Sequence, residues 1–352
     1  MVNARQRILA VLAHQTPDRV PTDIWIVPEA YRKLQEHFGK GVDINERLNI
    51  DTPASAEPRY VGPTLPETVA SGMLGYWGIR TRKIDYGCGE YDEISFNPLA
   101  SAQTIDDLEA YAWPKVEWFD FSGLAGQLRK HHDRKVTKCG YMAPFTFHVY
   151  LRGLENALTD PLLAPEFTEH LLGRLCEFFY AYHRRMFEAG EGLIDMGEVT
   201  DDYGMQTGPL ISLETFRRFY KPHMKRFCGL THEFGARVFH HDDGAMRDFL
   251  PDLLEVGIDI LNPIQWRCSG MDMEGLKQDF GSRLVFHGGI DNQHTLPFGS
   301  SADVRTEVRR AIDTLAGDKT GYILAPCHNI QANTPVENII AMYDEAHHYG
   351  RF

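Results

Sequence analysis

The chain has 352 residues, of which 43% are hydrophobic and 24% are charged, with 31 glycines and 19 prolines. This length and composition exclude a disordered, collagen-like or coiled-coil chain and fit one large barrel or two ordinary domains. The 36 Lys and Arg residues stand against 49 Asp and Glu residues, and the formal net charge of -13 disfavours binding to nucleic acid.

The sequence gives no sign of a membrane segment or of a disulfide framework. No apolar run approaches the roughly 18 residues that a membrane helix requires, and the N-terminus lacks the apolar core of a signal peptide. We therefore expect a cytoplasmic protein with no membrane partner. The six cysteines show no Cys-x-x-Cys spacing, so most are expected to be buried thiols, with one candidate metal ligand.

The first predicted elements are a helix and a strand. Ile8, Leu9 and Leu12 lie on one face of a helix predicted over about 4–13, and a strand-like run begins at Val20. Residues 50–125 are the least periodic part of the chain and are rich in Pro and Gly. They predict a long excursion with one hairpin, which covers the mouth of the fold or forms a homodimer interface, and no separate domain.

From residue 136 onward, short apolar runs alternate with amphipathic helices, which is typical of parallel β/α units. The strands are predicted at 136–139, 193–196, 237–240, 258–261, 284–287 and 322–325. One strand near Val20 and one more inside the irregular region bring the number to about eight. The sequence therefore predicts an α/β fold, a single (β/α)8 TIM barrel over 1–352. A doubly wound sheet would explain the same alternation.

Polar clusters follow five of these predicted strands. In a (β/α)8 barrel the catalytic groups stand just beyond the C-terminal ends of the strands, so these clusters should converge on one mouth. The clusters lie at 197–206, 241–244, 262–265, 288–292 and 326–329.

Three residues from two of these clusters form a candidate metal site. His241, Asp243 and Cys327 offer an imidazole nitrogen, a carboxylate oxygen and a thiolate to one divalent ion, with a fourth position open to a substrate. A His-Asp-Asp run is often a solvated loop, and a lone cysteine is more often a small buried side chain, but the position at strand ends favours ligands. His328 is the alternative to Cys327, because adjacent residues point in different directions.

Other polar residues of the mouth are candidates for catalysis and substrate binding. Asp202 and His287 are predicted to be catalytic, with His287 paired to the carboxylate of Asp291 as an acid/base or tautomer-fixing pair. Asp201 and Asp202 would cap the next helix in the alternative interpretation. Substrate contacts are predicted for Asp201, Gln206, Gln265, Asp291 and Asn292. No phosphate-binding loop, dinucleotide fingerprint or serine-hydrolase elbow is present in the sequence.

At these residues the chain resembles the uroporphyrinogen decarboxylase superfamily, which includes zinc-dependent methylcobalamin:coenzyme M methyltransferases and related corrinoid-linked methyltransferases. The resemblance runs nearly end to end and implies a single (β/α)8 barrel. It rests on Arg5-Gln-Arg-Ile-Leu-Ala, Thr16-Pro-Asp-Arg-Val-Pro21, His241-Asp-Asp-Gly244, Val256-Gly-Ile-Asp-Ile-Leu-Asn-Pro-Ile-Gln265, Phe286-His-Gly-Gly-Ile-Asp291 and Asn333-Thr-Pro-Val-Glu-Asn338.

The resemblance also implies a ligand set. Methyltransferase members bind zinc through a His-x-Cys pair and a distant Cys. By position, His241 matches that histidine and Cys327 matches the distant cysteine. Asp243 occupies the position of the other cysteine, so a carboxylate replaces a thiolate there. A mixed nitrogen, oxygen and sulfur set still suits zinc and widens the choice toward iron, cobalt or manganese.

The function implied by the resemblance is metal-dependent transfer of a methyl group between a small substrate and a corrinoid or thiol acceptor. No Asp-x-His-x-x-Gly corrinoid motif is present in the sequence, so a separate protein is expected to carry the corrinoid. One alternative is a metal-free decarboxylase, a lyase that uses Asp201 or Asp202, although the Arg-Gln-Ala-Gly-Arg segment of true decarboxylases does not follow Val20. A further alternative is a non-catalytic ligand-binding barrel.

Overall fold

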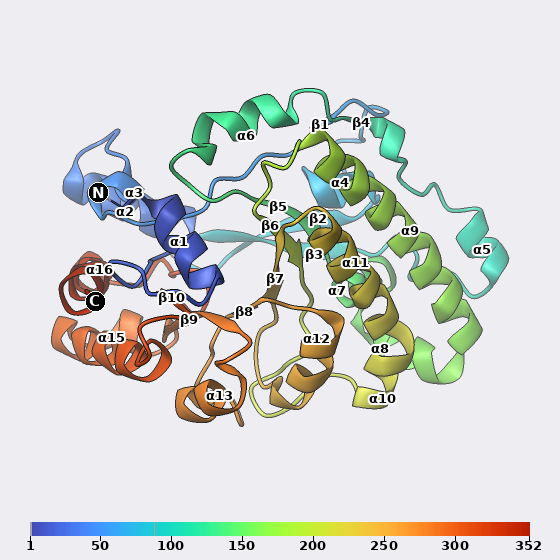
Figure 1. Ribbon diagram of the computed structural model, residues 1–352. Coiled ribbons are helices and arrows are strands. Elements are labelled where there is room, and N and C mark those ends of the chain that lie inside the picture. Colours follow the sequence, from blue (N-terminus) through green and yellow to red (C-terminus); the bar gives the residue numbers. More distant parts are fainter. Residues whose placement is uncertain (1, 88) are drawn as a thin grey trace.

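The computed structural model describes residues 2–87 and 89–352. Its centre is a parallel six-stranded sheet in the order β10-β9-β8-β7-β6-β5 (Figure 1). The strands are β5 Lys138–Met142, β6 Met196–Val199, β7 Arg237–His241, β8 Ile260–Asn262, β9 Val285–Ile290 and β10 Tyr322–Pro326. Each overlaps the range predicted for it, so the predicted parallel β/α architecture is confirmed.

Two extended segments connect the edge strands of this sheet. In the first, Thr22 pairs in parallel with Leu324 of β10. In the second, Ala54 pairs with Thr137 next to β5. The amide of Asp51 donates to the carbonyl of Thr22 at 2.9 Å and so links the two segments. The main chain therefore forms a ring of six sheet strands and two irregular members, which is consistent with the predicted TIM barrel, although the sheet hydrogen bonding is not continuous around it.

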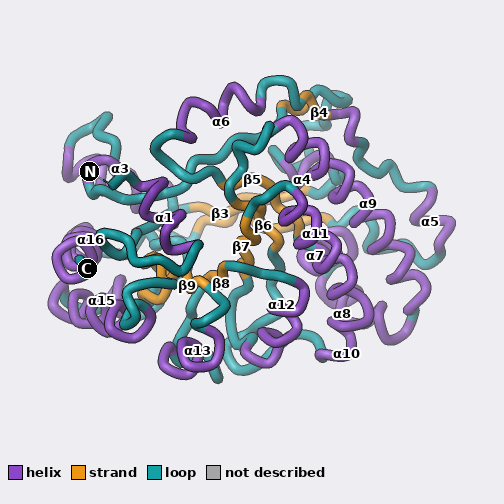
Figure 2. The backbone as a smooth tube through the Cα atoms, viewed as in Figure 1, coloured by secondary structure: helices purple, strands orange, loops and turns teal. Residues whose placement is uncertain are grey.

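Helices surround the sheet (Figures 1 and 2). The predicted N-terminal helix is α1 Ala4–Leu12, and the longest helix is α9 Pro165–Ala189. No helix of the described residues has the length and apolarity to cross a membrane. The other α-helices are α2 Pro28–Phe38, α3 Ile44–Arg47, α4 Met73–Tyr76, α5 Ile105–Glu109, α6 Leu124–His132, α7 Pro144–Arg152, α8 Leu154–Leu163, α10 Leu213–Thr215, α11 Lys221–Glu233, α12 Leu250–Val256, α13 Met273–Phe280, α14 Thr295–Phe298, α15 Ser301–Leu315 and α16 Val336–Tyr349.

The apolar face of α1 closes the N-terminal end of the barrel. Ile8, Val11 and Leu12 are buried there against a cluster that is separate from the main core outside the sheet. The other buried members of this cluster are Val136, Met196, Phe239, Ile260, Val285 and Ile323. Because these side chains come from β6 to β10 and from a position two residues before β5, they point into the barrel, and ligands are left with the opposite end.

The irregular region contains two small antiparallel sheets. Strands β2 Arg80–Asp85 and β3 Glu90–Phe96 form the predicted hairpin, and β1 Arg59–Tyr60 pairs with β4 Phe119–Asp120. The five described cysteines, in positions 139, 176, 228, 268 and 327, are buried and free of disulfides, as predicted, whereas Cys88 lies outside the described residues.

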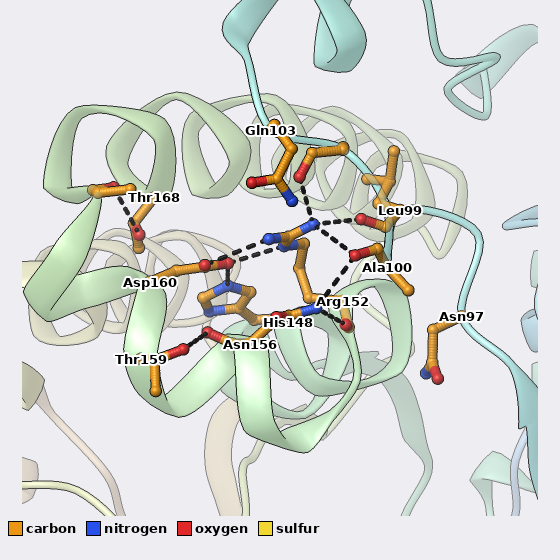
Figure 3. A network of polar contacts seen from close by, with 12 residues as sticks. Asn97, Leu99, Ala100, Gln103, His148, Arg152, Asn156, Thr159, Asp160 and Thr168 are labelled. Atoms are coloured by element: carbon orange, nitrogen blue, oxygen red, sulfur yellow. Dashed lines mark hydrogen bonds and ion pairs between the residues drawn. The ribbon is translucent and has the colours of Figure 1, made fainter.

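A buried arginine attaches the irregular region to the helices beside the barrel mouth (Figure 3). Arg152, at the end of α7, is only 3% exposed. Its guanidinium donates to the carbonyl of Leu99 and, at 2.8 Å, to that of Ala102. It also pairs with the carboxylate of Asp160 on α8, with Nε at 2.7 Å from Oδ2. Residues 99–102 are therefore held by charge-assisted hydrogen bonds that no water competes for.

Candidate metal centre

Three side chains at the C-terminal ends of β7 and β10 converge on one point. Ligand atoms of His241, Asp243 and His328 all lie within 4.8 Å of one another. Nε2 of His241 is 4.0 Å from Oδ1 of Asp243, and Nε2 of His328 is 3.7 Å from Oδ2 of the same carboxylate. All three residues are partly buried. Two imidazoles and a carboxylate form the donor set of known catalytic zinc sites, which leave one position open.

The structure corrects the prediction that Cys327 is the third ligand. The thiol of Cys327 donates to the carbonyl oxygen of Ile264 at 3.1 Å and is not among the ligand atoms that converge with those of His241 and Asp243. Burial raises the pKa of Cys327 well above its usual value. His328, the next residue, lies in the bend that follows β10, and its Nε2 comes within 3.7 Å of the carboxylate of Asp243. The alternative, His328, therefore takes the place of Cys327.

A chain of hydrogen bonds runs from His241 down into the barrel. Nδ1 of His241 lies 2.6 Å from Oδ1 of Asn262, and Nδ2 of Asn262 lies 2.7 Å from Nδ1 of His287. Nε2 of His287 lies 3.0 Å from Oδ2 of Asp23. Burial is the largest single influence on Asp23 and opposes its ionisation, but the hydrogen bond and charge of His287, the amide of Ile24 and the charge of Lys138 together lower the pKa of Asp23.

This chain fixes the tautomer of His241. Since an ionised Asp23 can only accept, His287 carries its proton on Nε2 and accepts from the amide of Asn262 at Nδ1. The carbonyl oxygen of Asn262 then accepts from Nδ1 of His241, which leaves the Nε2 lone pair of His241 free for a metal ion. With both ring nitrogens engaged and 3% exposure, His287 is placed to orient Asn262 and not to touch a substrate. Its partner is Asp23, not the predicted Asp291.

Replacing Asn262 by alanine is expected to weaken zinc binding by about 10- to 100-fold, because the tautomer of His241 is no longer fixed. The measurement is a competition titration of zinc against a chromophoric chelator. Asn156→Ala, which removes an amide that donates to the carbonyls of Ala100 and Arg152 far along the chain from this centre, should leave the zinc affinity unchanged. Equal affinities in wild type and Asn262→Ala would show that the hydrogen-bond chain does not act on the metal site.

Two other predicted residues lie at the mouth and hold Asp243. The side-chain amide of Gln265 donates to Oδ1 of Asp243 at 3.1 Å, and its oxygen accepts from the amide of Gly244 at 2.7 Å. Oδ1 of Asp202 accepts from the amide of Asp243 at 3.2 Å and lies 3.7 Å from Nε2 of His241. Burial raises the pKa of Asp202. Asp202 and Gln265 therefore border the open side of the candidate site.

The burial and hydrogen bonds of Asp201 do not fit the predicted substrate contact. It is 1% exposed, and its carboxylate accepts from the amides of Phe145 and Thr146 at the first turn of α7 and from the hydroxyl of Tyr203 at 2.6 Å. These contacts occupy the oxygens that a substrate would need. The carboxylate caps a helix, as the alternative interpretation had it, but the helix is α7 and not the one that follows Asp201.

The remaining predicted contacts also bind protein groups. Asp291 accepts from the amide of Gln293 at 2.8 Å near the start of α14 and pairs with Arg267, so it has a helix-capping role in place of a substrate contact. The side chain of Asn292 donates to the carbonyl of Asn329 at 3.1 Å and supports the loop that carries His328. Gln206 lies against the thiol of Cys268 at 3.5 Å, and its contact with a substrate stays a prediction.

Asp201 is expected to make the stability depend on pH. Burial raises its pKa from the ordinary 3.8 to about 7, so between these values the folded chain binds a proton that the unfolded chain has released. The contribution of Asp201 to the free energy of unfolding is fully present below pH 3.8. It falls by about 1.4 kcal/mol per pH unit as the pH rises from 3.8 to about 7. Urea unfolding between pH 4 and 8 should therefore show Asp201→Asn gaining stability relative to wild type as the pH rises. A difference that is independent of pH would contradict this assignment.

Comparisons with known proteins agree with this architecture. A family model described as uroporphyrinogen decarboxylase (URO-D) matches residues 84–349. The uroporphyrinogen decarboxylase of Thioalkalivibrio sulfidiphilus is 24% identical over 363 residues, which cover 98% of this chain and 97% of that protein. That of Solibacter usitatus is 24% identical over 346 residues, with 93% and 94% covered. A solved methyltransferase from Methanosarcina mazei, 18% identical, shares the fold over 99% of both chains with a TM-score of 0.71.

Proposed function

The chain belongs to the uroporphyrinogen decarboxylase (URO-D) family of enzymes, and within this family we propose that it is a metal-dependent methyltransferase. It would move a methyl group between a small substrate and a corrinoid or thiol acceptor. The observation that carries the proposal is the convergence of His241, Asp243 and His328 within 4.8 Å at the strand ends. This nitrogen and oxygen donor set suits zinc, and it also suits iron, cobalt or manganese.

The residues around the metal centre have distinct roles in this proposal. A bound divalent ion would lower the pKa of a thiol or hydroxyl in its open position, so that the deprotonated group is available at neutral pH. Asn262 holds His241 in the tautomer that leaves Nε2 free, and Gln265 orients Asp243. Asp202, 3.7 Å from Nε2 of His241, accepts the proton that the substrate releases. The corrinoid would arrive on a separate partner protein.

The test is methyl transfer from methylcobalamin to coenzyme M, a small thiol. The cobalt–carbon bond breaks, its electron pair stays on cobalt as cob(I)alamin, and the methyl group forms a bond to the thiolate sulfur. We expect the absorbance of methylcobalamin to fall with the zinc-loaded protein, and not after chelation or in His328→Ala. Failure of this transfer and of the reverse direction, with a loaded metal site, would overturn the proposal.

Decarboxylation is the second candidate because the curated relatives cited above carry that name over nearly the whole chain. The charge of the mouth argues against it, since Asp202 and Asp243 repel a carboxylate substrate at the distances of this site. Release of carbon dioxide from uroporphyrinogen that survives chelator treatment would favour decarboxylation over methyl transfer. Ligand binding without either product would favour the non-catalytic alternative.

A further inference from the structure

A cavity of about 520 Å³ lies next to the candidate metal centre, and none of the three candidate ligands lines it. Its walls come from residues 55–76 of the irregular region, from β5 and from α9. This volume is in the range of pockets that bind small organic molecules. The proposed chemistry at His241, Asp243 and His328 does not explain why the fold keeps this space.

The inner end of the cavity adjoins the barrel interior. Lys138 and Glu198 line it there and form an ion pair, with Nζ 2.6 Å from Oε2. The ammonium of Lys138 also lies 5.3 Å from the ring centre of Trp25, and the same indole lies 5.1 Å from the ring of His241. The indole of Trp25 thus contacts both a lining residue of the cavity and a candidate metal ligand.

The outer wall of the cavity is aromatic. The ring centres of Tyr76 and Phe119 are 5.0 Å apart, those of Phe119 and Tyr182 are 4.9 Å apart, and Tyr60 and Phe178 extend the wall. Burial raises the pKa values of Tyr76 and Tyr182, so both remain neutral phenols. Their hydroxyls have no hydrogen-bond partner among the described residues. Aromatic rings are the side chains that attract cations in proteins.

The charges of the cavity lining favour the same kind of ligand. The charge of Lys138 is balanced by Glu198, and burial lowers the pKa of His183 to about 4, so His183 is neutral at pH 7. Glu57 also lines the cavity, and no described residue donates a hydrogen bond to its carboxylate or pairs with it. Glu57, an exposed residue, is therefore the one acidic residue of the lining without a cationic partner among the described residues, in a chain whose net charge of -13 already repels anions.

We propose that this cavity binds an organic cation, a small molecule with an apolar or aromatic body and an ammonium end that faces Glu57. The aromatic wall packs against the body, and the carboxylate balances the charge that the ligand brings. This binding does not rest on the proposed function, because the candidate metal ligands contribute nothing to the lining.

The test is isothermal titration of the purified protein with two probes that share one ring and differ in charge, benzyltrimethylammonium and phenylacetate. We expect the cation to bind at least about tenfold more tightly than the anion, and Glu57→Gln to weaken the cation by about tenfold. Glu36→Gln removes a carboxylate from the exposed face of α2 and should leave the affinity of the cation unchanged.

Three results would overturn the inference: phenylacetate binding as tightly as the cation, full affinity for the cation in Glu57→Gln, or no binding of either probe. The same titration in Asp243→Ala separates this inference from the proposed function. Cation binding in wild type and in Asp243→Ala, with no metal in either, supports the cavity and overturns the metal-dependent methyltransferase. Metal bound to the wild type without binding of the cation would overturn the inference about the cavity and support the metal-dependent methyltransferase.

Discussion

Replacing His328 by alanine is expected to release the divalent ion, whereas replacing Cys327 by alanine is expected to leave it bound. Removing His328 leaves only His241 and Asp243, which do not complete a stable site, whereas the thiol of Cys327 is occupied by the carbonyl of Ile264. Elemental analysis of the purified chain after gentle dialysis should find about one ion per chain in wild type and Cys327→Ala, and nearly none in His328→Ala.

The control for this prediction is His170→Ala, which removes an exposed imidazole that pairs with Glu109. It should retain the full metal content of the wild type. Thermal unfolding of each variant shows whether a lost ion reflects a lost ligand or a lost fold. Retention in His328→Ala together with loss in Cys327→Ala would restore the ligand set predicted from the sequence. A wild-type chain without metal would contradict the site as a whole.

Replacing Arg152 by methionine is expected to destabilise the fold by about 3–5 kcal/mol, the usual cost of breaking a buried ion pair by removing one partner. The substitution leaves the carboxylate of Asp160 without its bidentate partner and the carbonyls of Leu99 and Ala102 without donors. Because Arg152 is 3% exposed, water cannot replace these bonds without opening the packing. Urea unfolding at 25 °C measures the change.

The matched control is Arg218→Met, which breaks an ion pair with Glu169 in which both side chains are more than half exposed. Its loss should stay below about 1 kcal/mol. Arg152→Met combined with Asp160→Leu should recover part of the lost stability, because the uncompensated charge is removed as well. A loss in Arg152→Met no larger than in Arg218→Met would show that this network does not hold the irregular region in place.

The periodic strands of the fold could be predicted from the sequence, but the irregular segment around Ala54 that completes the ring could not. Strands β5 to β10 are short apolar runs between amphipathic helices, which is a strong local signal. The member of the ring around Ala54 forms one isolated bridge to Thr137 and has no alternation of apolar and polar residues. This segment is extended because of its contacts with Thr137 and Thr22, and no local sequence pattern predicts those contacts.

The candidate site could likewise be predicted from the sequence only in part. The position of His241 and Asp243 at the end of a strand identified them, whereas the choice between Cys327 and His328 depends on which way the backbone turns after β10. Asn262 was part of a polar cluster predicted at the mouth, but no role was assigned to it, and Asp23 was not among the predicted site residues. Asp201 and Asp291 were predicted as substrate contacts because an acidic residue after a strand looks alike whether it caps a helix or binds a ligand.

The position of Trp25 makes its fluorescence sensitive to both the candidate metal centre and the cavity. Its indole lies 5.1 Å from the ring of His241 and 5.9 Å from that of His328, and the ammonium of Lys138 lies 5.3 Å from it on the side of the cavity. Indole emission responds to nearby charge and to quenching by imidazolium, so loading of the ion and filling of the cavity should each alter the fluorescence of this one residue. A spectrum that shifts in wild type and stays constant in Trp25→Phe would let both events be followed in the unlabelled protein.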